Sequence, residues 1–473
     1  MKTWTTAERY RRLDAHSTAE YATLQAQAAA CRWRQHYHIQ PPAGLLNDPN
    51  GFCYDGENYH LFYQWFPLGA VHGLKYWRAL ESRNLVQFQD RGIAISPDSE
   101  YDSHGAYSGS AIAQEDGSLL IAYTGNHRTE NWQRIPYQLT GRYDPKTGNF
   151  SRHLPPFMAG PPVGYTEHVR DPKIWQENGK LYTVLGAQRE NRSGCALITE
   201  NGGLLGELNT ALTDFGYMWE CPDFFTLNSK KVLIFSPQGL PALPDGRQAN
   251  LYQSGYLIGD YDRKTRTLTH QNFAELDAGF DFYAPQTCAG KDGQRLLIAW
   301  LGMPDTAYPT DDNGWQGCLS LPRVLSIENG TLRQRPLPAL EKLRSEKIEN
   351  PTNLAAGELL LENPTAAPFS LALFAGSDCQ TLLTFDGAAL TLDRSKSGRL
   401  PEILLKKIPT GKNSHIRRLS ARITQLQIYL DSSSLEIFIN NGEAVMSARI
   451  FPPKNAYGIL HSGAGQLDCW QYY

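Results

Sequence analysis

The hexapeptide Leu46-Asn47-Asp48-Pro49-Asn50-Gly51 opens a local plan that recurs along the chain: a polar residue, a strand, a hairpin turn and a second strand. After it come the apolar segment Phe52 to Tyr54, the pair Asp55-Gly56 and the apolar run Tyr59 to Gln64. An Asp-Gly or Asn-Gly pair between apolar runs is the strongest short-range signal of a hairpin, because both residues accept positive φ. We therefore predict a β-hairpin directly after Asp48.

Four further segments repeat this plan, at intervals of about 50 to 60 residues. Their polar anchors precede similar turns: Ser108 precedes Asp116-Gly117, Asp171 precedes Asn178-Gly179, Glu220 precedes Asn228-Ser229, and Tyr283 precedes Asp292-Gly293. The period is typical of a propeller in which each repeat is one four-stranded blade and the innermost strands line a central channel. We therefore expect the five anchors to converge at this channel.

Three of the five anchors are carboxylates, Asp48, Asp171 and Glu220. Two facing carboxylates, one ionised and one protonated, are what cleavage of a glycosidic bond requires. Repulsion among the three would keep Glu220 protonated, and Arg170 could offset it by keeping Asp171 ionised. Asp-Pro pairs are also common in turns, where the Asp bonds to nearby backbone N–H groups, so each motif alone is weak. Together they predict a hydrolytic site for sugars.

The bulk composition narrows the choice of partners. With 45 basic and 48 acidic side chains the net charge is only -3, so no strong field is available for nucleic acid or an anionic membrane. The eight cysteines show no C-x-x-C pair or zinc spacing, and no apolar stretch has the length of a signal peptide or a membrane span. We expect a cytoplasmic protein with reduced thiols that binds a small sugar and needs no metal or other cofactor. The oligomeric state stays open.

Changes in pattern divide the chain into four segments. Residues 1–36 are rich in Ala, Glu, Gln and Arg and predict a helical N-terminal extension on the outside of the first blade, with a capping box from Thr5 to Glu8. Residues 37–335 carry the five repeats of the predicted propeller. Residues 336–350, with a charged helical run, are expected to be a linker, and the short alternating strands of 351–473 predict an antiparallel β-sandwich.

The motifs Asn47-Asp48-Pro49-Asn50-Gly51, Arg170-Asp171-Pro172 and Glu220-Cys221-Pro222 closely resemble those of the glycoside hydrolase family of invertases and β-fructofuranosidases. Further similar stretches are Phe62-Tyr63-Gln64-Trp65, Tyr107-Ser108-Gly109-Ser110, Asp281-Phe282-Tyr283-Ala284-Pro285-Gln286 and Glu436-Ile437-Phe438-Ile439-Asn440. The resemblance covers nearly the whole chain from about residue 36. It implies an all-β protein, a five-bladed β-propeller followed by a β-sandwich, in agreement with the pattern.

The resemblance also implies roles for the carboxylates. Asp48 would be the nucleophile that forms a covalent fructosyl intermediate, Glu220 the general acid and base, and Asp171 the group that stabilises the transition state. Substrate-binding residues are expected among the neighbours of these motifs: Leu46, Asn47, Gln64, Tyr107, Ser108, Arg170, Tyr283 and Trp300. Asn47 and Gln64 suit sugar hydroxyls because their amides both donate and accept hydrogen bonds.

Within the family the chain looks most like the bacterial sucrose-6-phosphate hydrolases. A phosphate requires cations at the rim of the pocket, and His72, Lys75 and Arg78 form the one cluster close in sequence to a predicted inner strand. Departures from the family pattern, such as Trp77-Arg78-Ala79, leave the leaving group open. Three alternatives remain: an invertase without phosphate preference, an inverting hydrolase with more widely spaced carboxylates, and a carbohydrate-binding propeller without catalysis.

Overall fold

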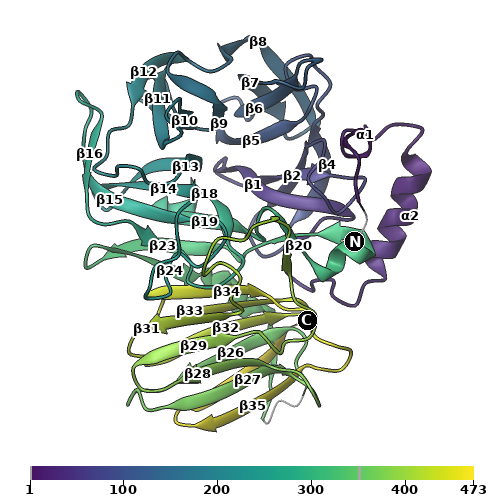
Figure 1. Cartoon of the computed structure of the whole chain (residues 1–473), viewed down its shortest axis with the longest axis vertical. Coiled ribbons are helices and arrows are strands. Elements are labelled where there is room, and N and C mark those ends of the chain that lie inside the picture. Colours follow the sequence, from purple (N-terminus) through teal and green to yellow (C-terminus); the bar gives the residue numbers. More distant parts are fainter. Residues whose placement is uncertain (1–2, 350–352, 473) are drawn as a thin grey trace.

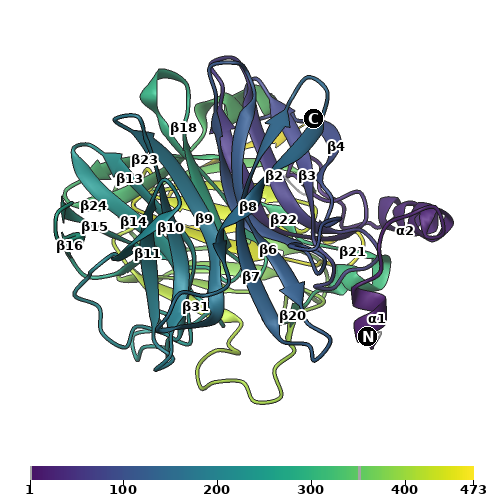
Figure 2. The same cartoon turned by 90° about the horizontal axis from the view of Figure 1, so that it is seen from above.

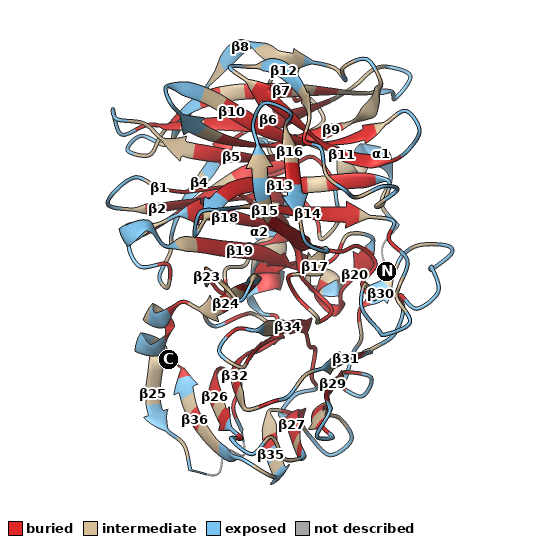
Figure 3. Ribbon diagram, turned by 90° about the vertical axis from the view of Figure 1, so that its left-hand side faces the viewer, coloured by how far each residue is buried: buried red, intermediate tan, exposed pale blue. Residues whose placement is uncertain are grey.

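The computed structural model describes residues 3–349 and 353–472, and it consists of two parts built from β-sheets (Figure 1). The larger part contains five sheets arranged around a centre, and the smaller part contains two sheets packed face to face. Buried residues follow the strands of both parts, so each has its own core (Figure 3). The predicted five-bladed propeller followed by a β-sandwich is confirmed.

Each of the five sheets places its strands side by side in chain order, as in a propeller blade. The first blade comprises β1 (Gly44–Tyr54), β2 (Tyr59–Phe66), β3 (Tyr76–Ser82) and β4 (Gln89–Ile95). The second comprises β5 (Ala106–Ala113), β6 (Leu119–Arg128), β7 (Arg134–Asp144) and β8 (Asn149–Ala159). The third comprises β9 (Tyr165–Glu177), β10 (Lys180–Arg189), β11 (Gly194–Glu200) and β12 (Gly203–Glu207).

The last two blades carry additional short strands. The fourth comprises β13 (Met218–Leu227), β14 (Lys230–Gln238), β15 (Gly255–Asp262) and β16 (Thr267–His270), and β17 (Ala274–Glu275) also pairs with β15. The fifth comprises β18 (Tyr283–Ala289), β19 (Arg295–Leu301), β23 (Arg323–Glu328) and β24 (Thr331–Pro336), with β22 (Cys318–Leu319) on β19. Strand β21 (Trp315–Gln316), from the segment between β19 and β22, pairs in parallel with β1, so the chain of the fifth blade is hydrogen-bonded to the first.

The first strand of every blade lies innermost, and β1, β5, β9, β13 and β18 contact one another in sequence around the ring, with β18 closing onto β1. All five predicted hairpin turns are present between the first two strands of each blade. Their turn residues have the expected positive φ, for example 104° at Gly56, 80° at Gly117 and 52° at Asn178. The turn between β18 and β19 includes the 3-10 helix η1 (Lys291–Gly293).

The smaller part is a sandwich of two antiparallel sheets. The first sheet contains β25 (Arg344–Lys347), β36 (Gln466–Tyr472), β26 (Gly357–Glu362), β32 (Gln425–Asp431), β33 (Ser434–Ile439) and β34 (Ala444–Arg449). The second contains β31 (Ile416–Ser420), β29 (Ala389–Asp393), β28 (Thr381–Phe385), β27 (Phe369–Ala375) and β35 (Gly458–Gly463). Alternate residues of both sheets, such as Leu371, Leu383 and Ile437, point into one apolar core.

The segment expected to be a linker has secondary structure of its own. The 3-10 helix η3 (Pro338–Leu343) is followed by β25, which pairs with β36. The helical run predicted within residues 336–350 ends at Leu343, because residues 344–347 gain hydrogen-bond partners on the edge of the sandwich sheet. A pair of short strands also joins the two parts. Strand β20 (Thr306–Ala307), just before the 3-10 helix η2 (Pro309–Asn313), pairs with β30 (Glu402–Ile403), which lies in the long segment between β29 and β31 of the sandwich.

The N-terminal extension forms two helices, α1 (Thr6–Arg9) and α2 (Thr18–Ala29), beside the first blade (Figure 1). The predicted capping box is present: Glu8 N donates to the Thr5 hydroxyl at 3.2 Å, and Thr5 N donates to the Glu8 carboxylate at 2.8 Å. Seen from above, α1 and β20 lie toward the same face of the propeller (Figure 2). No helix in the described ranges has both the length and the apolar character that crossing a membrane requires.

Candidate active site

The three carboxylates Asp48, Asp171 and Glu220 line one cavity of about 670 Å³. They reach it from β1, β9 and β13, the inner strands of blades one, three and four. The thiol of Cys221 shows how close they lie, because its Sγ is 4.0 Å from Asp48 Oδ2 and 3.6 Å from Asp171 Oδ2. Residues more than 170 positions apart in the sequence thus share one site.

Every inner strand departs from regular pairing at its polar anchor. The pairing register with the second strand of the blade shifts beside each anchor. The shifts lie between Leu46 and Pro49 in β1, Ala106 and Gly109 in β5, Arg170 and Lys173 in β9, Glu220 and Asp223 in β13, and Tyr283 and Gln286 in β18. A proline lies within two residues of the anchor in four of these strands and cannot donate a hydrogen bond to the ladder. Such bulges turn a side chain out of the regular alternation, which here directs the anchors into the channel.

Asp48 is surrounded by hydrogen-bond donors. The Ser108 hydroxyl donates to Oδ2 at 2.6 Å, the Gln64 amide to the same oxygen at 3.3 Å, and the Asn47 amide to Oδ1 at 3.1 Å. Burial and the negative charge of Glu220 raise the pKa of Asp48, whereas the hydrogen bonds from Ser108 and Asn47 and the charge of Lys75 act in the opposite direction. The surroundings therefore hold a carboxylate in a fixed orientation.

Glu220 is held from three directions. Arg170 donates from Nε and Nη2 to Oε1 at 2.9 and 2.7 Å, while the hydroxyl of Tyr283 and the amide of Gln238 donate to Oε2 at 2.6 and 2.8 Å. Arg170 Nε also lies 4.0 Å from Asp171 Oδ2, and its charge opposes the rise that burial causes in the pKa of Asp171, as the sequence predicts, while two of its nitrogens bond Glu220. Arg170 on β9 thus reaches a carboxylate on β13 of the neighbouring blade, 50 residues away in the sequence.

Asp171 sits on a strained backbone, with φ of 64°, and its Oδ2 accepts a hydrogen bond from Cys221 N at 2.9 Å. Burial raises the pKa of Asp171 to about 7; the charge of Arg170 opposes this rise, and the negative charge of Glu220 adds to it. The Asp171 carboxyl therefore gains and loses its proton near neutral pH.

Most of the other residues expected at the site also line the cavity. They are Asn47, Gln64, His72, Lys75, Tyr107, Ser108, Arg170, Tyr283 and Trp300. Lys75 Nζ donates to Asn47 Oδ1 at 2.6 Å, and burial lowers its pKa to about 7, so it belongs to the floor beside Asp48. The imidazole of His72 meets the edge of Trp300 with ring centroids 5.9 Å apart.

Two expected residues do not line this cavity. Leu46 is fully buried in the core between blades one and five, because the register shift that exposes Asp48 turns the preceding apolar side chain inward. Arg78 on β3 pairs with Asp90 at 2.7 Å and stacks over the ring of Trp65 at 4.8 Å. Arg78 lies on the third strand of the blade, paired with β2, and does not line the pocket, so the structure does not support it as a phosphate contact.

The structure also adds residues that the sequence motifs did not indicate. The N-terminal extension contributes Trp4, Thr6, Arg9 and Tyr10; the loop after β6 and the start of β7 contribute Trp132 and Arg134; and later segments contribute Gln238, Asp305, Asp311, Gln316 and Leu404. No short motif marks these residues, although the extension is rich in Arg. The expectation that this extension lies only on the outside of the first blade is therefore incomplete.

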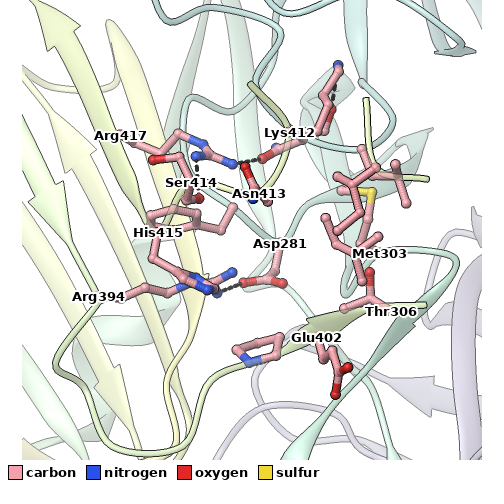
Figure 4. Close-up of a pocket in the computed structure, with 16 residues that line it drawn as sticks. Asp281, Met303, Thr306, Arg394, Glu402, Lys412, Asn413, Ser414, His415 and Arg417 are labelled. Carbon is pink, nitrogen blue, oxygen red and sulfur yellow. Dashed lines mark hydrogen bonds and ion pairs between the residues drawn. The ribbon is translucent and has the colours of Figure 1, made fainter. Parts of the chain in front are cut away.

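A second cavity, of about 290 Å³, lies between the propeller and the sandwich (Figure 4). Asp281 in its wall pairs with Arg394 at 2.5 Å, and Arg417 donates to the side chain of Asn250 at 2.8 Å. None of the residues expected from the sequence lines it. Thr306 of β20 lines both cavities, so the β20–β30 pair forms a wall between them.

Comparison with known proteins places this arrangement in a family. The model of the glycosyl hydrolases family 32 N-terminal domain matches residues 38–336, and that of the family 32 C-terminal domain matches residues 262–471. A sucrose-6-phosphate hydrolase of Staphylococcus xylosus is 43% identical over 98% of this chain and 96% of its own length. That of Bacillus subtilis is 40% identical over 92% of each chain.

Solved structures show the same architecture. The sucrose-6-phosphate hydrolase of Lactobacillus gasseri superimposes with a TM-score of 0.92 at 36% identity, covering 100% of this chain and 99% of that one. A Bombyx mori family 32 β-fructofuranosidase gives a TM-score of 0.83 at 30% identity, with coverages of 97% and 99%. Both the sequence matches and the shared propeller and sandwich show that this chain belongs to glycosyl hydrolases family 32.

Proposed function

We propose that this protein is a retaining β-fructofuranosidase that releases the fructosyl unit of sucrose 6-phosphate, and that it also hydrolyses sucrose. The observation that carries the proposal is the meeting of Asp48, Asp171 and Glu220 in one cavity, each with different partners. Two relatives that match almost the whole chain are named sucrose-6-phosphate hydrolases, and a Bombyx mori relative was solved in complex with sucrose. We further expect the reaction to occur in the cytoplasm, where a sugar phosphorylated on entry would be found.

The contacts support a division of roles. Asp48, held by three donors, attacks the anomeric carbon of the fructosyl unit and forms a covalent intermediate. Glu220 protonates the leaving glucosyl oxygen and then removes a proton from the attacking water, while Tyr283 and Gln238 fix its orientation. Asp171 accepts hydrogen bonds from sugar hydroxyls as positive charge develops at the fructosyl ring. Asn47, Gln64 and Ser108 bind the fructosyl hydroxyls beside Asp48.

The variants Asp48→Asn and Glu220→Gln test these roles directly. Each should lower kcat for sucrose 6-phosphate by about 10² to 10⁴-fold, because each removes one chemical step while leaving the shape of the cavity intact. Circular dichroism and thermal unfolding serve as controls for the fold. Turnover at the wild-type rate in both variants would show that the site lies elsewhere.

The stereochemistry and the substrate panel separate the remaining alternatives. NMR of the first-formed product should show β-fructofuranose for a retaining enzyme, whereas the α-anomer would indicate inversion. The ratio of kcat/KM for sucrose 6-phosphate to that for sucrose should be well above one. A ratio near one would leave an invertase without phosphate preference, and no turnover of either sugar would leave a carbohydrate-binding protein.

A further inference from the structure

The cavity contains five side chains that can carry positive charge, counted over the described ranges: Arg9, His72, Lys75, Arg134 and Arg170. Two of them are already engaged. Arg170 is bound to Glu220 through two nitrogens, and Lys75 donates to Asn47 next to Asp48, where the reacting fructosyl unit would lie. A phosphate on the glucosyl unit, on the far side of the bond to be cleaved, requires other cations.

Arg9 and Arg134 have no acidic partner within ion-pair distance among the residues that the structure describes. Arg134 Nη1 lies 3.4 Å from His168 Nδ1, and its guanidinium carbon lies 5.9 Å from the centroid of the Tyr107 ring. Its Nε is buried without a hydrogen-bond partner. Burial lowers the pKa of Arg134, and the like charge of Arg170 adds to this. The charge of Arg134 helps to lower the pKa of Glu167, after a backbone hydrogen bond and the charge of His168, but no ion pair joins the two side chains. An enclosed guanidinium without an ion-pair partner costs free energy that a bound dianion would relieve.

The acids on the cavity wall do not neutralise these two arginines. Asp305 accepts a hydrogen bond from the Tyr252 hydroxyl at 2.8 Å, and Asp311 accepts two from the Gln316 amide, at 2.8 and 2.9 Å. Burial also raises the pKa of Asp311 to about 7. The positive charge of Arg9 and Arg134 therefore stays available to a ligand.

The N-terminal segment holds Arg9 at the cavity by several contacts. Leu74 N donates to Arg9 O at 2.7 Å. The ring of Tyr10 packs edge-on against Trp132 at 5.3 Å and against His104 at 5.4 Å. Trp132, the ring that Tyr10 contacts, lies two residues before Arg134, the first residue of β7. The segments that carry the two arginines, the end of α1 and the start of β7, therefore lie beside each other where both arginines line the cavity.

We propose that Arg9 and Arg134 bind the phosphate group of the substrate, so that the N-terminal extension is the element that selects a phosphorylated sugar. This assignment rests on the proposed function and replaces Arg78 as a candidate. A guanidinium suits the task because its planar fork donates two parallel hydrogen bonds to phosphate oxygens. The neutral fructosyl unit would then lie between Asp48 and Glu220, with the phosphate near α1.

The test compares kcat/KM for sucrose 6-phosphate and for sucrose in the variants Arg9→Gln and Arg134→Gln. Each should lower the ratio of the two values by about 10- to 100-fold, since a hydrogen bond to a charged group is lost only with the phosphorylated substrate. The loss should appear in KM for sucrose 6-phosphate more than in kcat. Arg9→Lys, which keeps the charge but not the fork, should give an intermediate ratio.

Arg83→Gln is the matched control, because Arg83 is exposed and pairs with Glu57 on the surface at 2.5 Å. It removes the same charge from the protein without touching the cavity, and its ratio should equal that of the wild type. A wild-type ratio in both Arg9→Gln and Arg134→Gln, with normal thermal unfolding, would overturn the assignment. A ratio near one in the wild-type enzyme would instead refute the proposed substrate itself.

Discussion

Asp48 shows how single contacts set the chemistry of this site. Its carboxylate is enclosed and lies near other acids, both of which raise its pKa, and the hydroxyl of Ser108 counteracts them with a hydrogen bond of 2.6 Å to Oδ2. A carboxylate nucleophile must be ionised to attack. The strength of this hydrogen bond therefore helps to set the lowest pH at which the enzyme remains active. Ser108 comes from the neighbouring blade, 60 residues away.

Ser108→Ala should therefore raise the pKa of Asp48 and shift the acid limb of the kcat/KM profile to higher pH. Activity should fall more at pH 5 than at pH 8, because the unsupported carboxylate is protonated over a wider range of acid pH. The pH profile of kcat/KM for sucrose 6-phosphate measures this shift. Ser118→Ala, which affects only a hydrogen bond to Asp116 in the β5–β6 turn, is the control. An unchanged acid limb in Ser108→Ala would contradict the role of this hydroxyl.

At the scale of elements, the inner strands are joined by bonds that cross from blade to blade. Gly109 N on β5 donates to the Asn50 side chain of β1 at 3.0 Å, and the Gln286 side chain of β18 donates to Gly109 O at 2.8 Å. On the other side, the Ser110 hydroxyl donates to Pro172 O of β9 at 2.8 Å. The position of Ser108 relative to Asp48 therefore depends on how closely β5 approaches its neighbours.

Gly109→Ala should destabilise the propeller and lower activity together. An added Cβ would lie 2.0 Å from Ala122 O and 2.6 Å from Tyr123 Cα, both of them backbone atoms of β6, so β5 would have to shift. We expect a loss of about 1 to 3 kcal/mol in the free energy of unfolding, as for an overpacked core. Urea unfolding and kcat/KM are the two measurements.

Gly203→Ala provides the matched comparison on the outer strand β12, where the nearest atom to an added Cβ is Glu200 O at 3.4 Å. This variant should resemble the wild type in both measurements. If Gly109→Ala were as stable and as active as Gly203→Ala, the close approach of β5 and β6 at Gly109 would not contribute to stability or activity.

At the scale of the whole molecule, a buried histidine joins the entry of the propeller to the sandwich. The side chain of His38 is 0% exposed, with Nδ1 at 2.9 Å from Asp431 Oδ2 and Nε2 at 3.2 Å from Glu436 Oε1. Burial alone would lower the pKa of His38, but the hydrogen bonds to the two carboxylates outweigh it and raise the pKa to about 9. The charged imidazole thus bridges two strands of the sandwich.

This bridge predicts a pH-dependent stability. The folded pKa of His38 lies above its unfolded value, so the stabilisation is fully present below about pH 6.5 and is lost as the pH rises through 9. The shift corresponds to roughly 3 kcal/mol. The wild-type Tm should therefore fall between pH 6 and pH 9.5 by several degrees more than the Tm of His38→Gln. Equal falls in both proteins would show that His38 does not carry this dependence.

Much of the architecture was predictable because its signals are local. The turns at Asp55-Gly56, Asp116-Gly117 and Asn178-Gly179 require positive φ, and the apolar runs around them have the length of strands, so the repeat pattern alone indicated a propeller. The prolines after Asp48 and Asp171 are local as well, and they interrupt the strand where the anchor must turn inward.

The partners of charged groups were not predictable in this way. The sequence placed Arg170 beside Asp171, yet its guanidinium also binds Glu220 of the neighbouring blade. The sequence placed Arg78 near an inner strand, yet that side chain pairs with Asp90 outside the cavity. Arg9 lies far in sequence from the three carboxylate motifs and still lines the site. Sequence by itself determined the blades, the sandwich and the three carboxylates, because turn chemistry and alternation act over a few residues. Only the tertiary structure decided which charges meet, because ion pairing depends on distances between blades that no local pattern encodes.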